Sequence, residues 1–146
     1  MRPHRSRPHA VVCLDVRVAA RTENVSAVRR AIEALDLPET LIDDAKLLVS
    51  ELVTNSIRHA GLGPGEYIQI TVTSSGRLLR VIVQDRTRHL ALSSVVGAIR
   101  PSPGAESGWG LYLVDRIASR WGTSFGRRAG YWFELNPGPW PVWANP

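Results

Sequence analysis

The chain has 146 residues, of which 44% are hydrophobic and 21% charged, a composition typical of one soluble globular domain with its own core. Its single cysteine, Cys13, excludes an internal disulfide and favours a reducing compartment, and no apolar run approaches the roughly 20 residues that cross a bilayer. The net charge of +5 makes nucleic acid a candidate ligand. The arginines, however, are spread along the chain without a basic stripe, which disfavours nucleic-acid binding. Asp15 and Arg17 interrupt the apolar run after the arginine-rich N-terminus, which argues against a secretion signal and leaves the cytoplasm as the expected location.

The N-terminal part of the chain predicts an arm, a strand and a helix. Residues 1–9 are rich in Pro, Arg, His and Ser and are predicted to form a disordered basic arm. Alternating apolar residues predict a strand over 10–18. Apolar residues at helical spacing predict a helix over 22–36, with Thr22 as its capping residue.

A longer helix is predicted from Pro38 to about Ala60, before a glycine-rich stretch. Glu51 and Asn55 lie four residues apart at the edge of its apolar stripe, so their side chains are neighbours. An amide oxygen suits Mg²⁺, which keeps waters and phosphate oxygens as its other ligands, and a carboxylate one turn away could take a proton. For this pair alone, an amphipathic helix with a solvated Glu51 is the simpler interpretation.

The middle of the chain predicts a hairpin followed by a long connection. Residues 66–73 and 78–85 alternate and predict two antiparallel strands with one buried face. Asp85 has the parity of the buried residues and is expected to point toward the core, unless it only starts a turn. Residues 86–107 have no clear period and are typical of a functional lid or a disordered loop, with a short helix over 90–99 left open.

Gly108-Trp109-Gly110 leads into a helix predicted over about 110–120. Glycines before a helix let backbone amides approach an anion, and the helix N-terminus favours phosphate. A flexible junction is the alternative, because this short motif is weak by itself.

Two last strands are predicted over 121–126 and 130–135, on either side of a turn at 127–130, and residues 136–146 form a Pro- and Trp-rich tail. The domain therefore spans residues 10–135 in the order β-α-α-β-β-lid-α-β-β. This order predicts an α+β fold, a two-layer sandwich of a mixed, mostly antiparallel sheet with helices on one face and a pocket between the layers.

Together these pieces resemble the GHKL (Bergerat-fold) ATP-binding superfamily, and within it the small bacterial anti-sigma-factor serine/threonine kinases. Residues 50–60, SELVTNSIRHA, are similar to the N-box of that branch. Residues 81–85, VIVQD, resemble the strand that leads to the adenine-binding aspartate. Residues 107–114, SGWGLYLV, resemble the later glycine box, and residues 118–122 resemble the segment after that box. Several boxes in the right order are far more specific than any one of them.

By position, the resemblance implies that Glu51 is the general base, that Asn55 is the magnesium ligand and that Asp85 accepts a hydrogen bond from the adenine amino group. It implies ATP and Mg²⁺ as ligands. The cofactor-binding residues that it implies are Asn55, Arg58, Asp85, Thr87, Gly108, Trp109, Gly110 and Leu111.

The sequence departs from the family in the first glycine box, where Asp85-Arg86-Thr87-Arg88-His89 replaces Asp-x-Gly-x-Gly. Thr87 places a branched side chain where glycine permits close approach beside the adenine. Two functions therefore stay open. One is an anti-sigma factor that binds a sigma factor and phosphorylates an anti-anti-sigma (STAS-type) partner; the other is a non-catalytic interaction module with weak or no nucleotide binding. A homodimer is also left open.

Overall fold

The computed structural model describes residues 10–59, 65–75, 78–86, 103–104, 109–124 and 126–136. The predicted basic arm, most of the predicted lid and the tail beyond residue 136 lie outside the described residues. Within them, strands and helices follow in the predicted order. They are β1 (Val11–Ala19), α1 (Asn24–Glu33), α2 (Glu39–His59), β2 (Tyr67–Ser75), β3 (Leu78–Asp85), α4 (Trp109–Ile117), β4 (Arg120–Ser124) and β5 (Ala129–Leu135).

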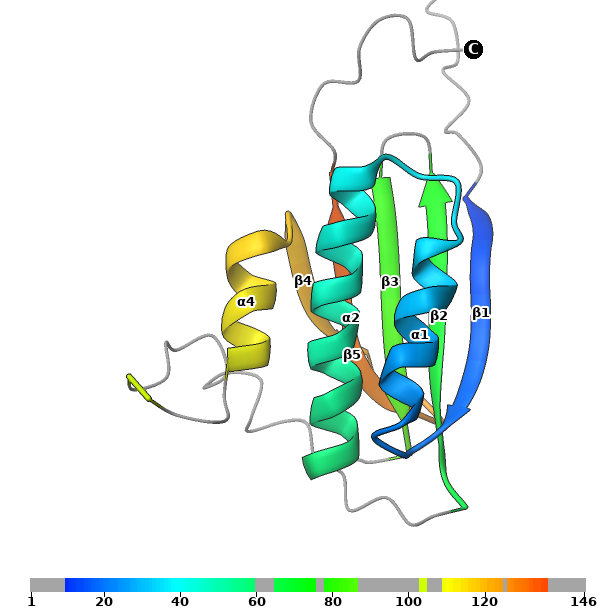
Figure 1. Ribbon diagram of the computed structural model, residues 1–146, viewed down its shortest axis with the longest axis vertical. Helices are drawn as coiled ribbons and strands as arrows, with labels where there is room; N and C mark the ends of the chain where they lie inside the picture. Colours follow the sequence, from blue (N-terminus) through cyan, green and yellow to red (C-terminus); the bar gives the residue numbers. More distant parts are fainter. Residues whose placement is uncertain are drawn as a thin grey trace, which may run out of the picture.

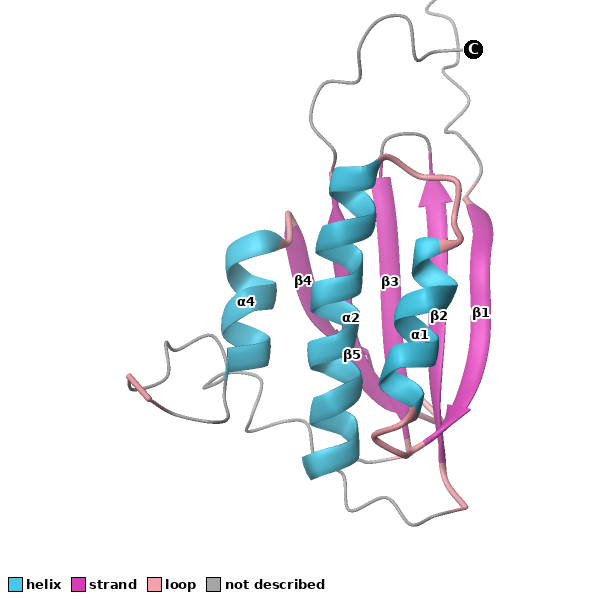
Figure 2. Ribbon diagram, viewed as in Figure 1, coloured by secondary structure: helices cyan, strands magenta, loops and turns pink. Residues whose placement is uncertain are grey.

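The five strands form one sheet in the order β1-β2-β3-β5-β4. The helices cover one face of this sheet, and α2 runs along its centre (Figure 1). Figure 2 shows the same two layers by type of secondary structure. The predicted α+β sandwich is therefore confirmed. All four strand pairings in the described part are antiparallel, so the mixed sheet that was expected has no parallel pair there.

The central hairpin follows from strict alternation in β2 and β3. Their apolar residues face the helices, and Ile70 lies opposite Val83 while Val72 lies opposite Val81. Asp85 continues the same parity at the end of β3 and is only 4% exposed. The prediction that its side chain points to the core side is confirmed.

The core lies between the sheet and the three helices of the described part. Burial of each large apolar side chain stabilises the fold by about 1.5–3 kcal/mol relative to exposure. Helix α2 contributes the largest share of helical core residues, and Phe133 is the largest fully buried side chain of the sheet. The buried hydrophobic residues on the helices are Val28, Ile32, Leu41, Ala45, Leu48, Val49, Leu52, Val53, Leu111 and Val114.

Helix α1 begins at Asn24, and the predicted cap by the side chain of Thr22 is wrong. The N-cap position is Glu23, which makes no capping hydrogen bond with its side chain. Backbone contacts organise this turn instead: the amide of Val25 donates to the carbonyl of Thr22 at 3.2 Å. Asn24 Nδ2 also donates to the carbonyl of Ala19 at 2.8 Å, which ties the start of the helix to the end of β1.

Helix α4 ends at Ile117, three residues before the predicted end. The amide of Ala118 still donates to the carbonyl of Val114 at 2.9 Å, but the amide of Ser119 donates to the carbonyl of Glu134 in β5 at 2.8 Å. A hydrogen bond to a distant strand therefore ends the helix.

Candidate functional site

Helix α2 presents two polar side chains at the edge of its buried stripe. Glu51 and Asn55 are one turn apart and half-buried, while the neighbouring Leu52 and Val53 are fully within the core. Arg58 lies further along the helix and is exposed, and it forms no ion pair with any residue that the structure describes. The predicted placement of Glu51 and Asn55 at the border of the core is confirmed.

The first turn of α4 packs directly on Asn55. Gly110 is buried, and a Cβ atom added to it would lie 2.7 Å from Asn55 Nδ2 and 3.4 Å from Asn55 Cγ. At 2.7 Å something must shift, so only glycine leaves room for the amide as it stands. Two residues that are far apart in the chain thus meet between the two helices. A helix N-terminus beside a half-buried amide is a suitable place for an anion and its counterion.

The two neighbours of Gly110 have different surroundings. Trp109 is half-buried and stands edge-on to Tyr112, with ring centroids 5.7 Å apart and planes at 77°. Leu111 is 7% exposed and belongs to the core. The side chain of Leu111 therefore supports the helix from inside, and of this residue only the backbone is available to a ligand.

Asp85 lies at the end of β3, opposite Ala129 of β5. Tyr131, on the neighbouring strand, is opposite Val83 and half-buried. Burial raises the pKa of Tyr131 above its ordinary value, and the charge of Asp85 raises this pKa further. The phenol therefore lies within electrostatic reach of the carboxylate. Tyr131 was not predicted as a site residue, because its alternation with Phe133 and Leu135 indicated only a strand.

Gly130 permits an unusually close approach of β5 to β3 beside Asp85. A Cβ atom on Gly130 would lie 1.8 Å from the carbonyl oxygen of Val83 and 2.7 Å from the Cα of Gln84. The sequence predicted Gly130 as the junction between a turn over 127–130 and a strand over 130–135, and the structure places it inside β5, which begins one residue earlier at Ala129. A glycine inside a strand is the signal that could have indicated this approach.

Thr87 and Gly108, which the sequence predicted to bind nucleotide, lie outside the described residues. Among the residues that are described, no three His, Cys, Asp or Glu side chains gather in a way that could hold a metal ion. In the same part of the chain, no helix has the length and hydropathy required to span a membrane.

The site combines a half-buried Glu-x-x-x-Asn pair on α2, the first turn of α4 packed on Asn55 and a buried aspartate at the end of β3. In an α+β domain this combination fits a nucleotide-binding site. A comparison with family models is consistent with this: the model described as histidine kinase-like ATPase domain matches residues 18–129 of the 146. The chain therefore belongs to the histidine kinase-like ATPase domain family. A search of curated proteins found no match.

The matched segment contains Glu51, Asn55, Asp85 and Gly110, and it ends just before Gly130. An ATPase domain implies ATP as the ligand, so the predicted ATP-binding class is supported at this level.

Proposed function

We propose that this protein is a cytoplasmic anti-sigma factor with serine/threonine kinase activity toward a STAS-type anti-anti-sigma partner. The observation that carries the proposal is the contact between the side-chain amide of Asn55 and Gly110 in the first turn of α4. It brings two boxes that resemble those of the anti-sigma kinases to one place. The resemblance of residues 50–60 and 107–114 to that branch supports the finer assignment.

The residues around Asn55 fit a nucleotide with its magnesium ion. Because Gly110 has no side chain, the Asn55 amide packs directly against the backbone of the first turn of α4. Asn55 would hold Mg²⁺ through its amide oxygen, because magnesium accepts one or two protein oxygens and keeps waters and phosphate oxygens for the rest. When bound, the ion neutralises charge on the phosphates. Backbone amides at the start of α4 would orient the same phosphates.

Glu51 would serve as the general base. It lies one turn before Asn55 on α2 and is half-buried, so it can face a bound phosphate while keeping access to an incoming hydroxyl. In this role its carboxylate would accept the proton of the serine or threonine hydroxyl as that oxygen bonds to the γ-phosphorus of ATP. The bond between the γ-phosphorus and the β–γ bridging oxygen breaks, and ADP leaves. Phosphoryl transfer depends chiefly on positioning and charge neutralisation, and this arrangement provides both.

Asp85 would select adenine. An ionised carboxylate accepts hydrogen bonds but cannot donate one. It can therefore bind the exocyclic amino group of adenine, but it repels the carbonyl oxygen that guanine carries at the same place. Its burial at 4% exposure strengthens that choice, because water cannot replace the missing hydrogen bond. ATP is therefore expected to bind more tightly than GTP.

The second candidate function is a non-catalytic interaction module of the same fold. The observation that favours it is the sequence Asp85-Arg86-Thr87-Arg88-His89, in which both glycines of the family's first glycine box are replaced. In that case the protein would bind its partner without phosphoryl transfer.

Calorimetric titration of Mg-ATP into the wild type and the Asn55→Ala variant tests the proposal. Loss of a ligand to the ion is expected to weaken binding by roughly tenfold or more. Ser56→Ala is the matched control, because Ser56 is a half-buried neighbour on α2 whose hydroxyl makes no hydrogen bond to another described residue. We expect this control to bind within about twofold of the wild type.

A phosphotransfer assay with a STAS-type partner separates the two candidate functions. Glu51→Ala is expected to bind Mg-ATP nearly as well as the wild type but to give no phosphorylated serine or threonine by mass spectrometry. Wild-type protein that binds Mg-ATP without transferring phosphate would refute the kinase. Wild-type protein that binds no nucleotide would favour the interaction module.

A further inference from the structure

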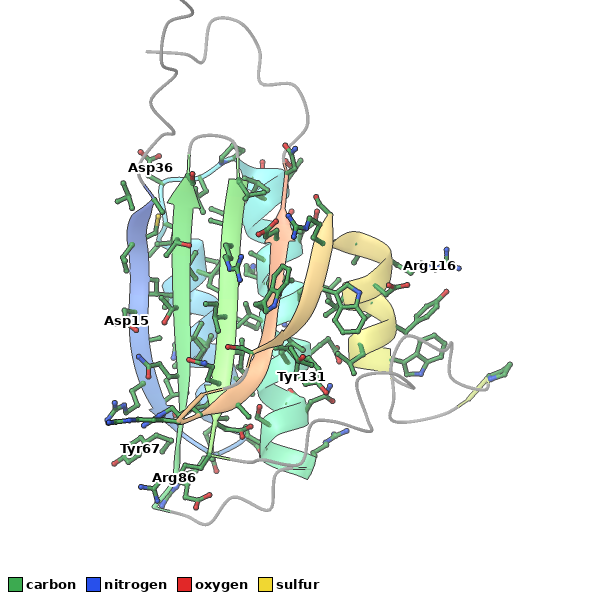
Figure 3. All side chains as sticks on the ribbon, turned by 180° about the vertical axis from the view of Figure 1, so that it is seen from behind. Asp15, Asp36, Tyr67, Arg86, Arg116 and Tyr131 are labelled. Atoms are coloured by element: carbon green, nitrogen blue, oxygen red, sulfur yellow. The ribbon has the colours of Figure 1, made fainter. Side chains whose placement is uncertain are left out.

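The face of the sheet that the helices leave free carries a tryptophan on β5. Phe133 is fully buried in the core, so Trp132, its neighbour in the strand, points to the opposite face, onto which Figure 3 looks. The register places Trp132 between Ile82 of β3 and Gly122 of β4. Ile82 and Trp132 are both half-buried, so two apolar side chains lie side by side on this face in partial contact with water.

A glycine and two arginines hold the indole of Trp132 in place. A Cβ atom on Gly122 would lie 3.0 Å from Cε2, Cζ2 and Nε1 of the indole, so the ring packs on the backbone of β4. The guanidinium carbon of Arg80 lies 4.3 Å from the ring centroid, and that of Arg120 lies 5.8 Å from it. Guanidinium groups are attracted to the ring of tryptophan, so these contacts orient the indole before any ligand binds.

Glu134 orients the same two arginines. It is 5% exposed, accepts a hydrogen bond from Arg80 at 3.0 Å and lies 3.9 Å from Arg120. The two arginine side chains still keep 40% and 73% of their surface exposed. Their other N–H groups, and the Nε1–H of Trp132, make no hydrogen bond to a residue that the structure describes. We call this surface the indole platform; it consists of Arg80, Ile82, Arg120, Gly122 and Trp132.

The indole platform combines an apolar centre with hydrogen-bond donors, which suits an extended proline-rich segment. Such a segment forms a polyproline II helix without internal hydrogen bonds, so its carbonyl groups are free to accept. Proline-rich segments dock on aromatic side chains, and proline has no N–H group that would need an acceptor. The chemistry of the platform and that of a proline-rich segment are therefore complementary.

A segment of this kind follows β5 in the same chain. Residues 137–146, which lie outside the described residues, contain no charged side chain, and four of the ten are proline. Pro139 and Pro141 flank Trp140, and Trp143 follows two residues later. This composition matches the ligand that the indole platform is suited to bind.

The platform also lies within reach of this segment. The amide of Asn136 donates to Ser119 Oγ at 3.0 Å, which fixes the point where the segment begins. Trp132 lies four residues earlier in the chain, or about 13 Å back along the strand. The dipeptides Asn-Pro, Pro-Gly and Gly-Pro of residues 136–139 are typical of turns. A reversal there, followed by polyproline II at about 3.1 Å per residue, brings residues 139–143 back to the platform.

We propose that the indole platform is a binding site for an extended proline-rich segment and that residues 139–143 of the same chain occupy it. Pro139 and Pro141 pack on the indole of Trp132, and the carbonyl groups around them accept hydrogen bonds from Arg80 and Arg120. In this arrangement the segment covers the exposed part of the indole and keeps other ligands from the platform.

This site is separate from the proposed nucleotide site. The indole platform lies on the free face of the sheet, whereas Glu51, Asn55 and Gly110 lie on helices of the other layer (Figure 2). Mg-ATP binding and docking of residues 139–143 can therefore fail separately, and each experiment tests its own proposal.

NMR spectroscopy of the full chain tests the proposal through the indole signals of its five tryptophans. NOEs are expected between the ring protons of Trp132 and those of Pro139 and Pro141. The indole N–H of Trp132 should exchange with solvent roughly fivefold faster in the double variant Pro139→Ala/Pro141→Ala than in the wild type, because the cover is lost. Pro146→Ala is the matched control, since it removes a proline outside residues 139–143, and it should leave this exchange rate unchanged.

A change on the platform gives the reciprocal measurement. Trp132→Ala should move the indole signals of Trp140 and Trp143 to the positions that they have in a synthetic peptide of residues 137–146. Tyr67→Ala is the control for this change, because Tyr67 is 48% exposed at the other end of the sheet from the end of β5 (Figure 3). Circular dichroism verifies that each variant folds, and the proline variants leave every described residue unchanged.

Three results would overturn the proposal. One is a wild-type protein without NOEs between Trp132 and the two prolines. Another is an exchange rate of the Trp132 indole that the double proline variant leaves unchanged. The third is a set of NOEs that disappears on dilution from about 1 mM to about 10 μM, because the occupant would then be the segment of another copy.

Discussion

Replacement of Gly130 by alanine tests how closely β5 approaches β3 beside Asp85. The added Cβ would lie 1.8 Å from the carbonyl oxygen of Val83, and it would also lie 2.7 Å from the carbonyl carbon of the same residue. All these neighbours are backbone atoms, so no side-chain rotation can relieve the overlap. The two strands must separate locally, and they must do so next to the pair formed by Asp85 and Ala129.

The size of the effect follows from the distance that must be gained. Contacts of a real Cβ atom are rarely shorter than 3.0–3.4 Å, so the carbonyl of Val83 must retreat by about 1.2–1.6 Å. A displacement of that size takes an inter-strand hydrogen bond out of the bonding range and leaves buried polar groups unpaired. One or two such losses cost about 2–5 kcal/mol of the free energy of unfolding. In a domain of this length, that corresponds to a fall in Tm of roughly 5–15 °C.

Thermal and urea unfolding followed by circular dichroism measure this loss. Gly126→Ala is the matched control, because a Cβ there meets nothing nearer than the carbonyl oxygen of Arg128 at 3.9 Å, and it should change stability by less than about 0.5 kcal/mol. The Gly130→Ala variant should also bind Mg-ATP more weakly, since Asp85 moves with its strand. A variant with the stability and nucleotide affinity of the wild type would refute the close approach of the strands.

Two further predictions concern titration and a buried ion pair. The pKa of Tyr131 is raised by burial and by Asp85, so its contribution to stability is present below pH 10 and is lost as the pH rises through the folded pKa. Absorbance titration at alkaline pH should show one tyrosine that ionises at higher pH than the others. Tyr131→Phe should remove this ionisation, and Asp85→Asn should move its pKa toward the ordinary value of 10.0. An unchanged pKa in Asp85→Asn would contradict the proximity of Tyr131 and Asp85. Glu134 is 5% exposed and bonds Arg80 at 3.0 Å, with Arg120 more distant at 3.9 Å. Glu134→Ala should therefore lower the free energy of unfolding, measured in urea, by about 1–2 kcal/mol. Glu134→Gln should lower it less, because the amide oxygen still accepts a hydrogen bond from Arg80. Equal losses in the two variants would show that this hydrogen bond contributes nothing to stability.

The architecture was predictable because its signals are local. Alternation in residues 66–73 and 78–85 determines which side chains face the core. Because few residues separate these two strands in the sequence, they pair as an antiparallel hairpin. The same parity was enough to place Asp85 toward the core. Each of these inferences needs only a few neighbouring residues, so no knowledge of the remaining chain was required.

Element boundaries depend on distant contacts and were less predictable. Ser119 continues a helical pattern in the sequence, yet its amide bonds Glu134 and the helix ends at Ile117. The last strand was predicted to begin at Gly130, yet β5 begins one residue earlier, because Ala129 pairs with Asp85 of β3 and Gly130 lets the backbone approach Val83. In both cases a tertiary contact prevails over the local preference.

The site shows the same division between local and distant information. Asn55 and Gly110 were each identified by a box of the family, but no spacing along the chain could show that they touch. Glycine in a helix is less favourable than alanine by about 0.5–1 kcal/mol, so folding alone would favour alanine in the first turn of α4. A methyl group there would stand 2.7 Å from Asn55 Nδ2 and displace the amide. Gly110 therefore lowers the stability of its own helix but leaves the Asn55 side chain in its position. A loss of local stability of this kind is expected of a residue that shapes a binding site.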